Sequence, residues 1–406
     1  MSIIVKPKIL IPKDVDMSKW AIIACDQFTA QPKYWNELET LVGDSKSTLN
    51  LVFPEIYLGQ NDEKRIKDIN RKIEEYANSD LFYEVDNFIL VERIMEHETR
   101  VGLMIAIDLD SYDWNRVRVP IRATEDTLLE RLPVRIKIRK NAPMEFTHTL
   151  ALIDDADKEI IEPIYKSRHK LRKLYDFELN MGGGRIIGYE VPNSDEIIEK
   201  IIELLDLDTQ VKKYGTDAGV LMVIGDGNHS VATAKCIWEE TKKTLSEEEQ
   251  KDHPAKYMLV ELNNIYGEGE FHPIHRIVYN PPAGFLEELT DSLTGAGVMK
   301  LYVGKQEEYI AAPETASNGI MLVQKFLEQK LKENPNMVVD YVHSEHHLVS
   351  AVEEGGDGTI GIVMPTFPKS ELVNFVVNVG NLPKKSFSIG EAEEKRYYLE
   401  GRRIVK

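Results

Sequence analysis

A buried strand that runs through a glycine turn into a helix constrains the fold of this chain most. Residues 220–224 are five consecutive apolar residues, three of them β-branched, which is typical of a strand covered on both faces. The polar segment 225–230 (GDGNHS) follows at once. We expect a strand, a tight turn and a helix from Val231, capped by Asn228 or Ser230, as in α/β proteins.

The same turn is a candidate anion site. Gly225 and Gly227 let the backbone approach a ligand closely, and a helix start directs free N–H groups and a positive dipole end toward it. A simple capped corner is the alternative, but it needs one polar side chain, whereas four gather here: Asp226, Asn228, His229 and Ser230. Asp226 could bind a magnesium ion or orient a hydroxyl group. His229 could donate to a phosphate oxygen or act as an acid.

Composition excludes several classes of protein. With 50 basic and 68 acidic residues the formal charge is −18, so long-range attraction to nucleic acid or an anionic membrane is not expected. No apolar run approaches the ~18 residues of a membrane span, and no signal peptide is evident. Only two cysteines occur, Cys25 and Cys236, which fits a reducing compartment. The chain is therefore expected to be cytoplasmic, without a membrane or nucleic-acid partner.

The length of 406 residues predicts two lobes, because single cores stop growing near about 250–300 residues. We expect a main α/β domain over residues 1–295, which carries the turn, and a smaller C-terminal α/β lobe over residues 296–406. Regular alternation after Lys300 supports the second lobe. Its expected elements are helix 320–332, strand 337–343, helix 348–354, strand 359–364 and helix 369–377.

Periodicity places further elements in the main domain. Residues 61–77 carry apolar side chains at helical spacing, and residues 194–206 form a second expected helix. The segments 88–93 and 100–108 predict a β-hairpin, and residues 144–154 predict one further strand. A charged segment before the glycines at 182–184 is expected to be helical. The fold class is therefore α/β with a mixed sheet, and α+β is the alternative.

Other segments offer weaker candidates. His275 and Arg276 could bind phosphate or carboxylate, although an ordinary strand entrance explains them equally well. Lys385 and Ser386 lie in a basic loop that either binds phosphate or is merely solvated. Cys25 follows an apolar run and is more typical of a small buried residue than of a nucleophile. Three histidines, at 343, 346 and 347, lack acidic or cysteine partners at metal-binding spacing, so no metal site is expected there.

These motifs, in this order, resemble a widespread bacterial family, domain of unknown function 1015. Its hallmark Asp-Gly-His-His-Arg is similar to residues 226–230, its Pro-Thr-His-Arg to residues 273–276, and its Pro-x-Lys-Ser to residues 383–386. Its His-Glu-x-Thr is echoed by residues 124–127, where the histidine is absent. The resemblance extends from about residue 120 to about residue 390.

The turn also resembles the ParB and sulfiredoxin superfamily, which includes free-serine kinases. That resemblance implies a mixed-sheet core with phosphate bound at the turn. Asn228 and Ser230 replace the family's histidine and arginine, so Arg276 or Lys385 would have to neutralise the phosphate. The turn has no cysteine, which excludes sulfiredoxin chemistry, and the acidic chain shows no basic helix-turn-helix for DNA partition.

Together these observations predict an enzyme that acts on a phosphate ester or nucleotide. The reaction would be phosphoryl transfer, with a small hydroxy amino acid such as serine as one candidate substrate. Asp226 would orient a metal or hydroxyl group, His229 and the turn backbone would hold phosphate, and Glu125 would be the base. The alternative is a non-catalytic module that binds a nucleotide or metabolite and acts through a protein partner.

Overall fold

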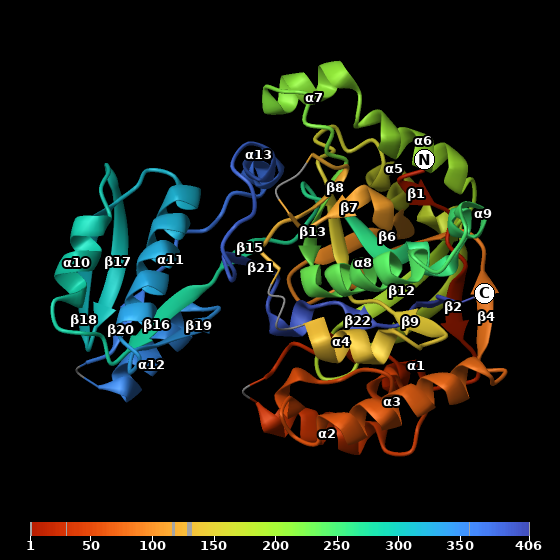
Figure 1. The fold of residues 1–406 in the computed structure, drawn as a ribbon, viewed down its shortest axis with the longest axis horizontal. Coiled ribbons are helices and arrows are strands. Elements are labelled where there is room, and N and C mark those ends of the chain that lie inside the picture. The colour runs from red at the N-terminus through yellow and green to blue at the C-terminus, as the bar shows by residue number, and fades with distance from the viewer. Residues whose placement is uncertain (1, 30, 116–117, 128–131, 357, 406) are drawn as a thin grey trace. The chain divides into compact units, whose positions relative to one another are not determined.

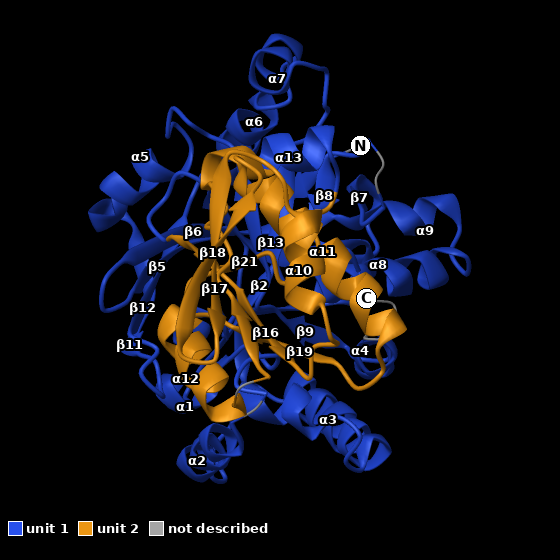
Figure 2. Cartoon of the chain, turned by 90° about the vertical axis from the view of Figure 1, so that its left-hand side faces the viewer, with its two compact units in different colours: residues 1–269, 373–380, 392–406 blue, residues 270–372, 381–391 orange. Residues whose placement is uncertain are grey.

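The chain folds into two compact units. The computed structural model describes residues 2–29, 31–115, 118–127, 132–356 and 358–405. The first unit comprises residues 1–269, 373–380 and 392–406, and the second comprises residues 270–372 and 381–391 (Figure 2). The expected boundary lay between residues 295 and 296, with the whole C-terminus in the smaller lobe. The C-terminal segment instead joins the first unit, because its strands pair there with strands from the start of the chain.

A large mixed sheet forms the centre of the first unit (Figure 1). The parallel pairs are β10 (Leu150–Ile153) with β14 (Tyr257–Asn264), β13 (Met222–Asp226) with β8 (Ile121–Ala123), and β8 with β7 (Tyr112–Asp113). The other neighbours are antiparallel. The mixed-sheet α/β class is thus confirmed. The strands in spatial order are β11 (Arg172–Glu178), β12 (Arg185–Val191), β5 (Phe88–Ile94), β6 (Thr99–Asp108), β14 (Tyr257–Asn264), β10 (Leu150–Ile153), β13 (Met222–Asp226), β8 (Ile121–Ala123) and β7 (Tyr112–Asp113), with β1 (Ile4–Val5) beside β6.

Several local predictions are confirmed. The expected hairpin is β5 and β6, which pair antiparallel from Ile89 opposite Met104 to Ile94 opposite Thr99. The expected helix over residues 61–77 is α3 (Asp62–Ala77), which buries its apolar face. The helix expected to reach residue 206 is α6 (Ser194–Glu203), which ends earlier because Asp206 caps α7 (Leu207–Tyr214) by accepting the Thr209 N–H.

Two predictions of element type are wrong. The single strand expected over residues 144–154 is two strands in different sheets, β9 (Met144–Phe146) and β10. The chain turns between them, where Thr147 Oγ1 accepts the Thr149 N–H at 3.1 Å. The segment before the glycines at 182–184, expected to be helical, is strand β11, because its pairing with β12 outweighs its charged composition.

Helices cover the large sheet. The helix α8 (Asn228–Lys242) packs beside α4 (Leu132–Arg139), and α4 packs beside α3. Val231, Ala234 and Trp238 on α8 are fully buried in the same core as the sheet residues. The remaining α-helices of this unit are α1 (Met17–Trp20), α2 (Pro32–Val42), α5 (Ile161–Lys166), α9 (Glu247–Lys251) and α13 (Leu372–Asn378).

Smaller sheets complete the first unit. The strand β23 (Gly401–Arg403) lies between β2 (Ile9–Pro12) and β9, and β4 (Phe82–Val85) pairs with the other edge of β2. The strand β22 (Tyr397–Tyr398) pairs with β3 (Ile22–Ile23). The C-terminal residues 397–403 are therefore bound by backbone hydrogen bonds to the start of the chain and to the β9 segment.

The second unit has its own sheet and helices. The alternation expected after Lys300 is confirmed at the level of helix and strand order. The sheet order is β18 (Gln306–Ala312), β17 (Gly297–Val303), β20 (Ile360–Ile362), β16 (His275–Tyr279) and β19 (Val338–Val342), with helices α10 (Phe285–Ser292), α11 (Ala316–Glu333) and α12 (Glu345–Gly355). A separate pair joins β15 (Phe271–Pro273) to β21 (Phe387–Ile389).

Candidate functional site

Three strand ends meet at one edge of the large sheet. The strand β8 runs parallel to β13, so both end there, and β10 runs antiparallel to β13 with Leu150 opposite Asp226. The residues after β8, the turn after β13 and the residues before β10 therefore share this edge. The structure thus brings Thr124 to the turn, with Glu125 next to it in the chain, and His148 and Thr149 lie on the other side. The catalytic role of Glu125 stays a prediction.

Gly227 sets the geometry of the turn. Its φ of +79° is in the left-handed region, and a Cβ atom there would lie 2.7 Å from Thr149 Oγ1. The chain passes through Gly227 directly into α8, which begins at Asn228 and has no side-chain cap. The expected helix start at Val231 with Asn228 or Ser230 as cap is therefore wrong, because left-handed Gly227 occupies the cap position.

Side chains from neighbouring strands hold the turn in place. Asn228 Nδ2 donates to Thr124 Oγ1 at 3.3 Å, and Thr124 Oγ1 donates to the Ile224 carbonyl at 2.6 Å. Within the part of the chain that the structure describes, two buried oxygens at the turn accept or donate no hydrogen bond: Asn228 Oδ1 and Thr149 Oγ1. Buried polar groups ordinarily find partners, so these two oxygens mark a place where a ligand could supply them.

A lysine distant in sequence lies beside the turn. Lys395 Nζ is 3.4 Å from Asp226 Oδ2, and the two side chains are 8% and 18% exposed. Asp226 Oδ1 accepts the Gly227 N–H at 2.8 Å. The cation beside Asp226 is thus Lys395, and this arrangement does not fit the magnesium-binding role that the sequence suggested for Asp226. Among the described residues no group of three or more His, Cys, Asp or Glu side chains is placed to hold a metal ion.

Arg396 fixes the segment that carries Lys395. Its guanidinium donates to Glu261 Oε2 at 2.7 Å, to Glu400 Oε2 at 2.6 Å and to the Thr147 carbonyl at 2.6 Å. The Arg396 side chain is 2% exposed. Burial alone would raise the pKa of Glu261, but Arg100 and Arg396 hold it below its ordinary value. One buried ion cluster therefore positions both Lys395 and the Thr147 segment.

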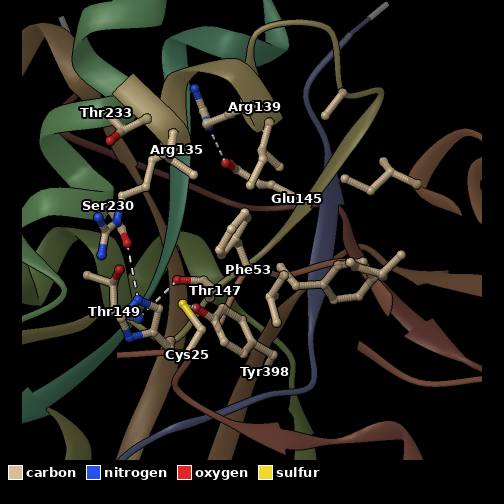
Figure 3. A pocket seen from close by; sticks show the side chains of 18 of the residues that line it. Cys25, Phe53, Arg135, Arg139, Glu145, Thr147, Thr149, Ser230, Thr233 and Tyr398 are labelled. Carbon is tan, nitrogen blue, oxygen red and sulfur yellow. Dashed lines mark hydrogen bonds and ion pairs between the residues drawn. The ribbon is translucent and has the colours of Figure 1, made fainter. Parts of the chain in front are cut away.

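A cavity of ≈ 290 Å³ opens next to the turn inside the first unit (Figure 3). Its walls come from α3, α4, the chain segment 51–58, the β9–β10 connection and the start of α8. Most of the lining is apolar, with Phe53, Ile73 and Val134 among the lining residues. Ser230 belongs both to this wall and to the first turn of α8. The cavity and the turn therefore meet at Ser230.

A histidine and a thiol lie among the polar groups of the cavity. His148 Nε2 lies 3.1 Å from Ser230 Oγ, and its ring packs edge-on against Tyr398 with centroids 5.1 Å apart. The Tyr398 hydroxyl donates to Cys25 Sγ at 3.1 Å. Burial, with Asp26 as a second contribution, raises the pKa of the Cys25 thiol to about 12. Cys25 is therefore a neutral thiol near neutral pH, which agrees with its expected non-catalytic character.

The charges of the cavity wall occur as ion pairs. Arg135 on α4 pairs with Glu55, and Arg139 Nε lies 2.5 Å from Glu145 Oε2. Burial opposes ionisation of Glu145, but Arg139 and Arg402 hold the pKa of this carboxyl below its ordinary value. Each arginine faces a carboxylate, so these two pairs add no net charge to the wall.

The other predicted site residues belong to the second unit. His275 Nδ1 accepts the Met364 N–H at 3.1 Å, and burial lowers the pKa of its imidazole. The Arg276 guanidinium lies 4.7 Å from the centre of the Tyr341 ring. Ser386 Oγ donates to the Pro383 carbonyl at 2.6 Å, whereas Lys385 is exposed. Their phosphate-binding roles stay predictions.

Sequence reasoning missed three residues near the turn. The strand predicted over residues 144–154 hides His148 in its middle, although the polar triplet 147–149 inside an apolar segment is a sign of a break. Lys395 and Arg396 lie in the charged stretch 391–396, which carries no motif. Only the pairing of the C-terminal strands shows that this stretch reaches the turn.

The family described as protein of unknown function (DUF1015) matches residues 7–353. No protein in the curated collection matches the chain. Among the described residues, no helix is long and apolar enough to cross a membrane.

Three solved structures show distant similarity. A conserved hypothetical protein from Pyrococcus furiosus is 12% identical, with 73% of this chain and 90% of that chain covered and a TM-score of 0.33. A free serine kinase in complex with AMP is 12% identical, with coverage of 73% and 90% and a TM-score of 0.37. C-terminally truncated SbnI from Staphylococcus aureus is 9% identical, with coverage of 71% and 83% and a TM-score of 0.37.

Proposed function

The chain belongs to the DUF1015 family of proteins of unknown function, and we propose that it is an enzyme acting on a phosphate ester or nucleotide. The observation that carries this proposal is the position of Lys395, a nearly buried cation, beside Asp226 where α8 begins. A lysine and a helix N-terminus both favour an anion at the same place. Phosphate suits this place because its oxygens can accept hydrogen bonds from the neighbouring hydroxyl and backbone N–H groups.

The turn offers several groups to a phosphate. The first residues of α8 present backbone N–H groups at the positive end of the helix dipole. Gly227 keeps the backbone accessible because it has no Cβ atom. The hydroxyl group of Thr149 lies against it and is buried without a partner among the described residues. Because Ser230 stands where the family's motif has arginine, the sequence predicted Arg276 or Lys385 as the neutralising cation; in this proposal Lys395 takes that role.

Phosphoryl transfer is the reaction that we propose at the turn. The oxygen of an acceptor hydroxyl group forms a bond to the transferred phosphorus while the bond from phosphorus to the leaving oxygen breaks. Glu125, beside the turn, receives the hydroxyl proton, and the leaving oxygen departs with the electron pair of the broken bond. Asp226 orients the attacking hydroxyl and His229 contacts the phosphate. Serine is one candidate acceptor, and AMP, ADP and ATP are the candidate nucleotides.

Phosphorus NMR tests this proposal directly. The chain would be incubated with ATP, ADP, phosphoserine and serine, and new phosphorus signals would be followed with time. We expect turnover by the wild type and its loss in Asp226→Asn and in His229→Ala, both with unchanged circular dichroism. Asp80→Asn is the matched control, because Asp80 forms an exposed pair with Lys13.

The NMR results distinguish an enzyme from a non-catalytic binding module. Full activity in both turn variants would contradict the proposal. Line broadening or shifts of a phosphorus signal without new products would instead support the non-catalytic module that binds a nucleotide or metabolite. Arg276→Lys and Lys385→Ala, measured in the same assay, test the two predicted phosphate ligands of the second unit.

A further inference from the structure

We propose that the cavity beside the turn is a binding site for a small molecule without net charge, which has an apolar body and an oxygen that accepts a hydrogen bond from Ser230. The ligand needs no phosphate group, so the inference goes beyond the proposed function and does not depend on it. The cavity, its charge balance and the His148–Ser230 contact each contribute one property of the ligand.

The size and lining of the cavity define the body of the ligand. At ≈ 290 Å³ the cavity has room for on the order of ten water molecules, since each occupies about 30 Å³ in the liquid. Side chains such as Phe53, Ile73 and Val134 gain by contact with apolar surface rather than with water. An apolar body of about ten non-hydrogen atoms would fill this space, which is more than a serine side chain supplies.

The charges of the wall define the net charge of the ligand. Arg135 faces Glu55 and Arg139 faces Glu145, so each cation of these pairs already has an anion. A charged ligand would lose part of its hydration and find these charges already compensated, which is unfavourable in a mostly apolar cavity. The Cys25 thiol and the Tyr398 hydroxyl are neutral as well. A net-uncharged ligand is therefore favoured.

The contact between His148 and Ser230 defines the polar group. His148 is 5% exposed, and among the described residues its Nδ1 atom is buried without a hydrogen-bond partner. A buried N–H without a partner is rarer than a buried acceptor without one, so the favoured tautomer has no proton on Nδ1. His148 Nε2–H then donates to Ser230 Oγ, 3.1 Å away.

This tautomer determines what Ser230 can do. Ser230 Oγ accepts the hydrogen bond from His148 Nε2–H. The Ser230 O–H therefore remains free to donate into the cavity that Ser230 lines. The same arrangement argues against Ser230 as a nucleophile, because His148 offers it no basic nitrogen. His148 is thus a positioning residue that orients the Ser230 hydroxyl group. The ligand supplies a carbonyl, ether or hydroxyl oxygen.

Four related probes test these three properties separately. Benzylacetone is neutral and carries a carbonyl, butylbenzene lacks the oxygen, phenylbutyrate is an anion and phenylbutylamine is a cation. Binding to the full chain would be measured by ligand-observed proton NMR. We expect benzylacetone to bind about three- to tenfold more tightly than butylbenzene, the range for one net hydrogen bond, and the two ions to bind more weakly than both.

Variants assign the binding to this cavity. Ser230→Ala should remove the preference for benzylacetone over butylbenzene, and Ala142→Phe should abolish binding of both by filling the cavity. Ala156→Phe, the same change at an exposed turn, should have no effect. If Ala142→Phe fails to fold, Val52→Trp at a half-exposed wall position replaces it.

The outcomes are decisive in each direction. No binding of benzylacetone by the wild type, or equal binding by Ala142→Phe and Val52→Trp, would overturn the site. Equal affinity for phenylbutyrate would overturn the neutral-ligand requirement, and an unchanged preference in Ser230→Ala would overturn the hydrogen bond. None of these results involves a nucleotide, so they leave the proposed phosphate site to its own test.

Discussion

Lys395 Nζ lies 3.4 Å from Asp226 Oδ2, where the last residue of β13 enters the glycine turn. The lysine comes from the C-terminal segment, which Arg396 binds to Glu261 and Glu400. Asp226 supplies a negative charge beside Lys395. A phosphate at the turn would compete for the same lysine. Under the proposed function, the pair with Asp226 would hold Lys395 at the turn until a phosphate replaced the carboxylate.

Asp226→Asn separates binding from catalysis. The substitution removes a negative charge beside the proposed phosphate, so ATP should bind at least as tightly as to the wild type, while turnover is lost. Isothermal titration calorimetry gives the affinity and phosphorus NMR gives the turnover. Weaker binding by Asp226→Asn would show that the carboxylate itself contributes to the ligand site.

Gly227→Ala should lower the free energy of unfolding and distort the backbone of the turn. A non-glycine residue at φ +79° costs about 1–3 kcal/mol. The new Cβ atom would also lie 2.7 Å from Thr149 Oγ1. Urea denaturation measures the loss in the free energy of unfolding.

Gly215→Ala is the matched control for that variant. Gly215 has a φ of +73° but nothing within 4 Å of its added Cβ atom, so this variant reports backbone strain alone. The loss of stability in Gly227→Ala should exceed the loss in Gly215→Ala. Equal losses would mean that Thr149 does not restrict the turn.

Arg396→Met should destabilise the protein in a pH-dependent way. Removing the arginine leaves Glu261 and Glu400 buried without it, which costs about 3–5 kcal/mol at about pH 7. The pKa of Glu261 is lowered in the folded protein, so its contribution to stability is complete above 4.5 and is lost as pH falls through the folded value. The difference in stability between wild type and variant should therefore narrow on acidification.

Urea denaturation at about pH 7 and about pH 4 checks this. Arg403→Met is the control, since Arg403 is exposed and lies 3.7 Å from an equally exposed Glu84. If the difference in the free energy of unfolding between the wild type and Arg396→Met is the same at both pH values, the role assigned to Glu261 is contradicted.

Cys25 should resist alkylation in the folded protein. Burial is the main cause that raises the pKa of its thiol to about 12, so at about pH 8 only about one molecule in ten thousand carries the thiolate. Mass spectrometry after iodoacetamide treatment, in a Cys236→Ser background, measures the rate. Labelling should accelerate strongly in guanidinium, and rapid labelling of the folded chain would disprove a half-buried, protonated thiol.

The sequence could predict elements whose determinants are local. The apolar run before Gly225 and the glycines themselves predict a strand and turn, and the spacing of Ile66, Ile69 and Ile73 predicts α3. The hairpin of β5 and β6 is also local. The expected helix start at Val231 lies three residues too late, because Gly227 in the left-handed conformation takes the cap position and α8 begins at Asn228.

Other parts of the site depend on contacts between distant segments. His148 and Ser230 are 82 residues apart, and Thr124 and Asn228 are 104 apart. Such pairs follow from strand order and register, which periodicity within one segment does not specify. The position of Lys395 depends in addition on the buried Arg396 cluster. A charged stretch in sequence gives no sign that one of its members is nearly buried.

Binding of ATP to Lys395→Met tests the central claim most directly. A charge-assisted hydrogen bond contributes about 1.5–3 kcal/mol, so the dissociation constant measured by calorimetry should rise about 10- to 100-fold. Lys13→Met, which removes the partner of exposed Asp80, should leave it unchanged. An unaltered affinity of Lys395→Met, with a melting temperature equal to that of the wild type, would contradict a phosphate site at this turn.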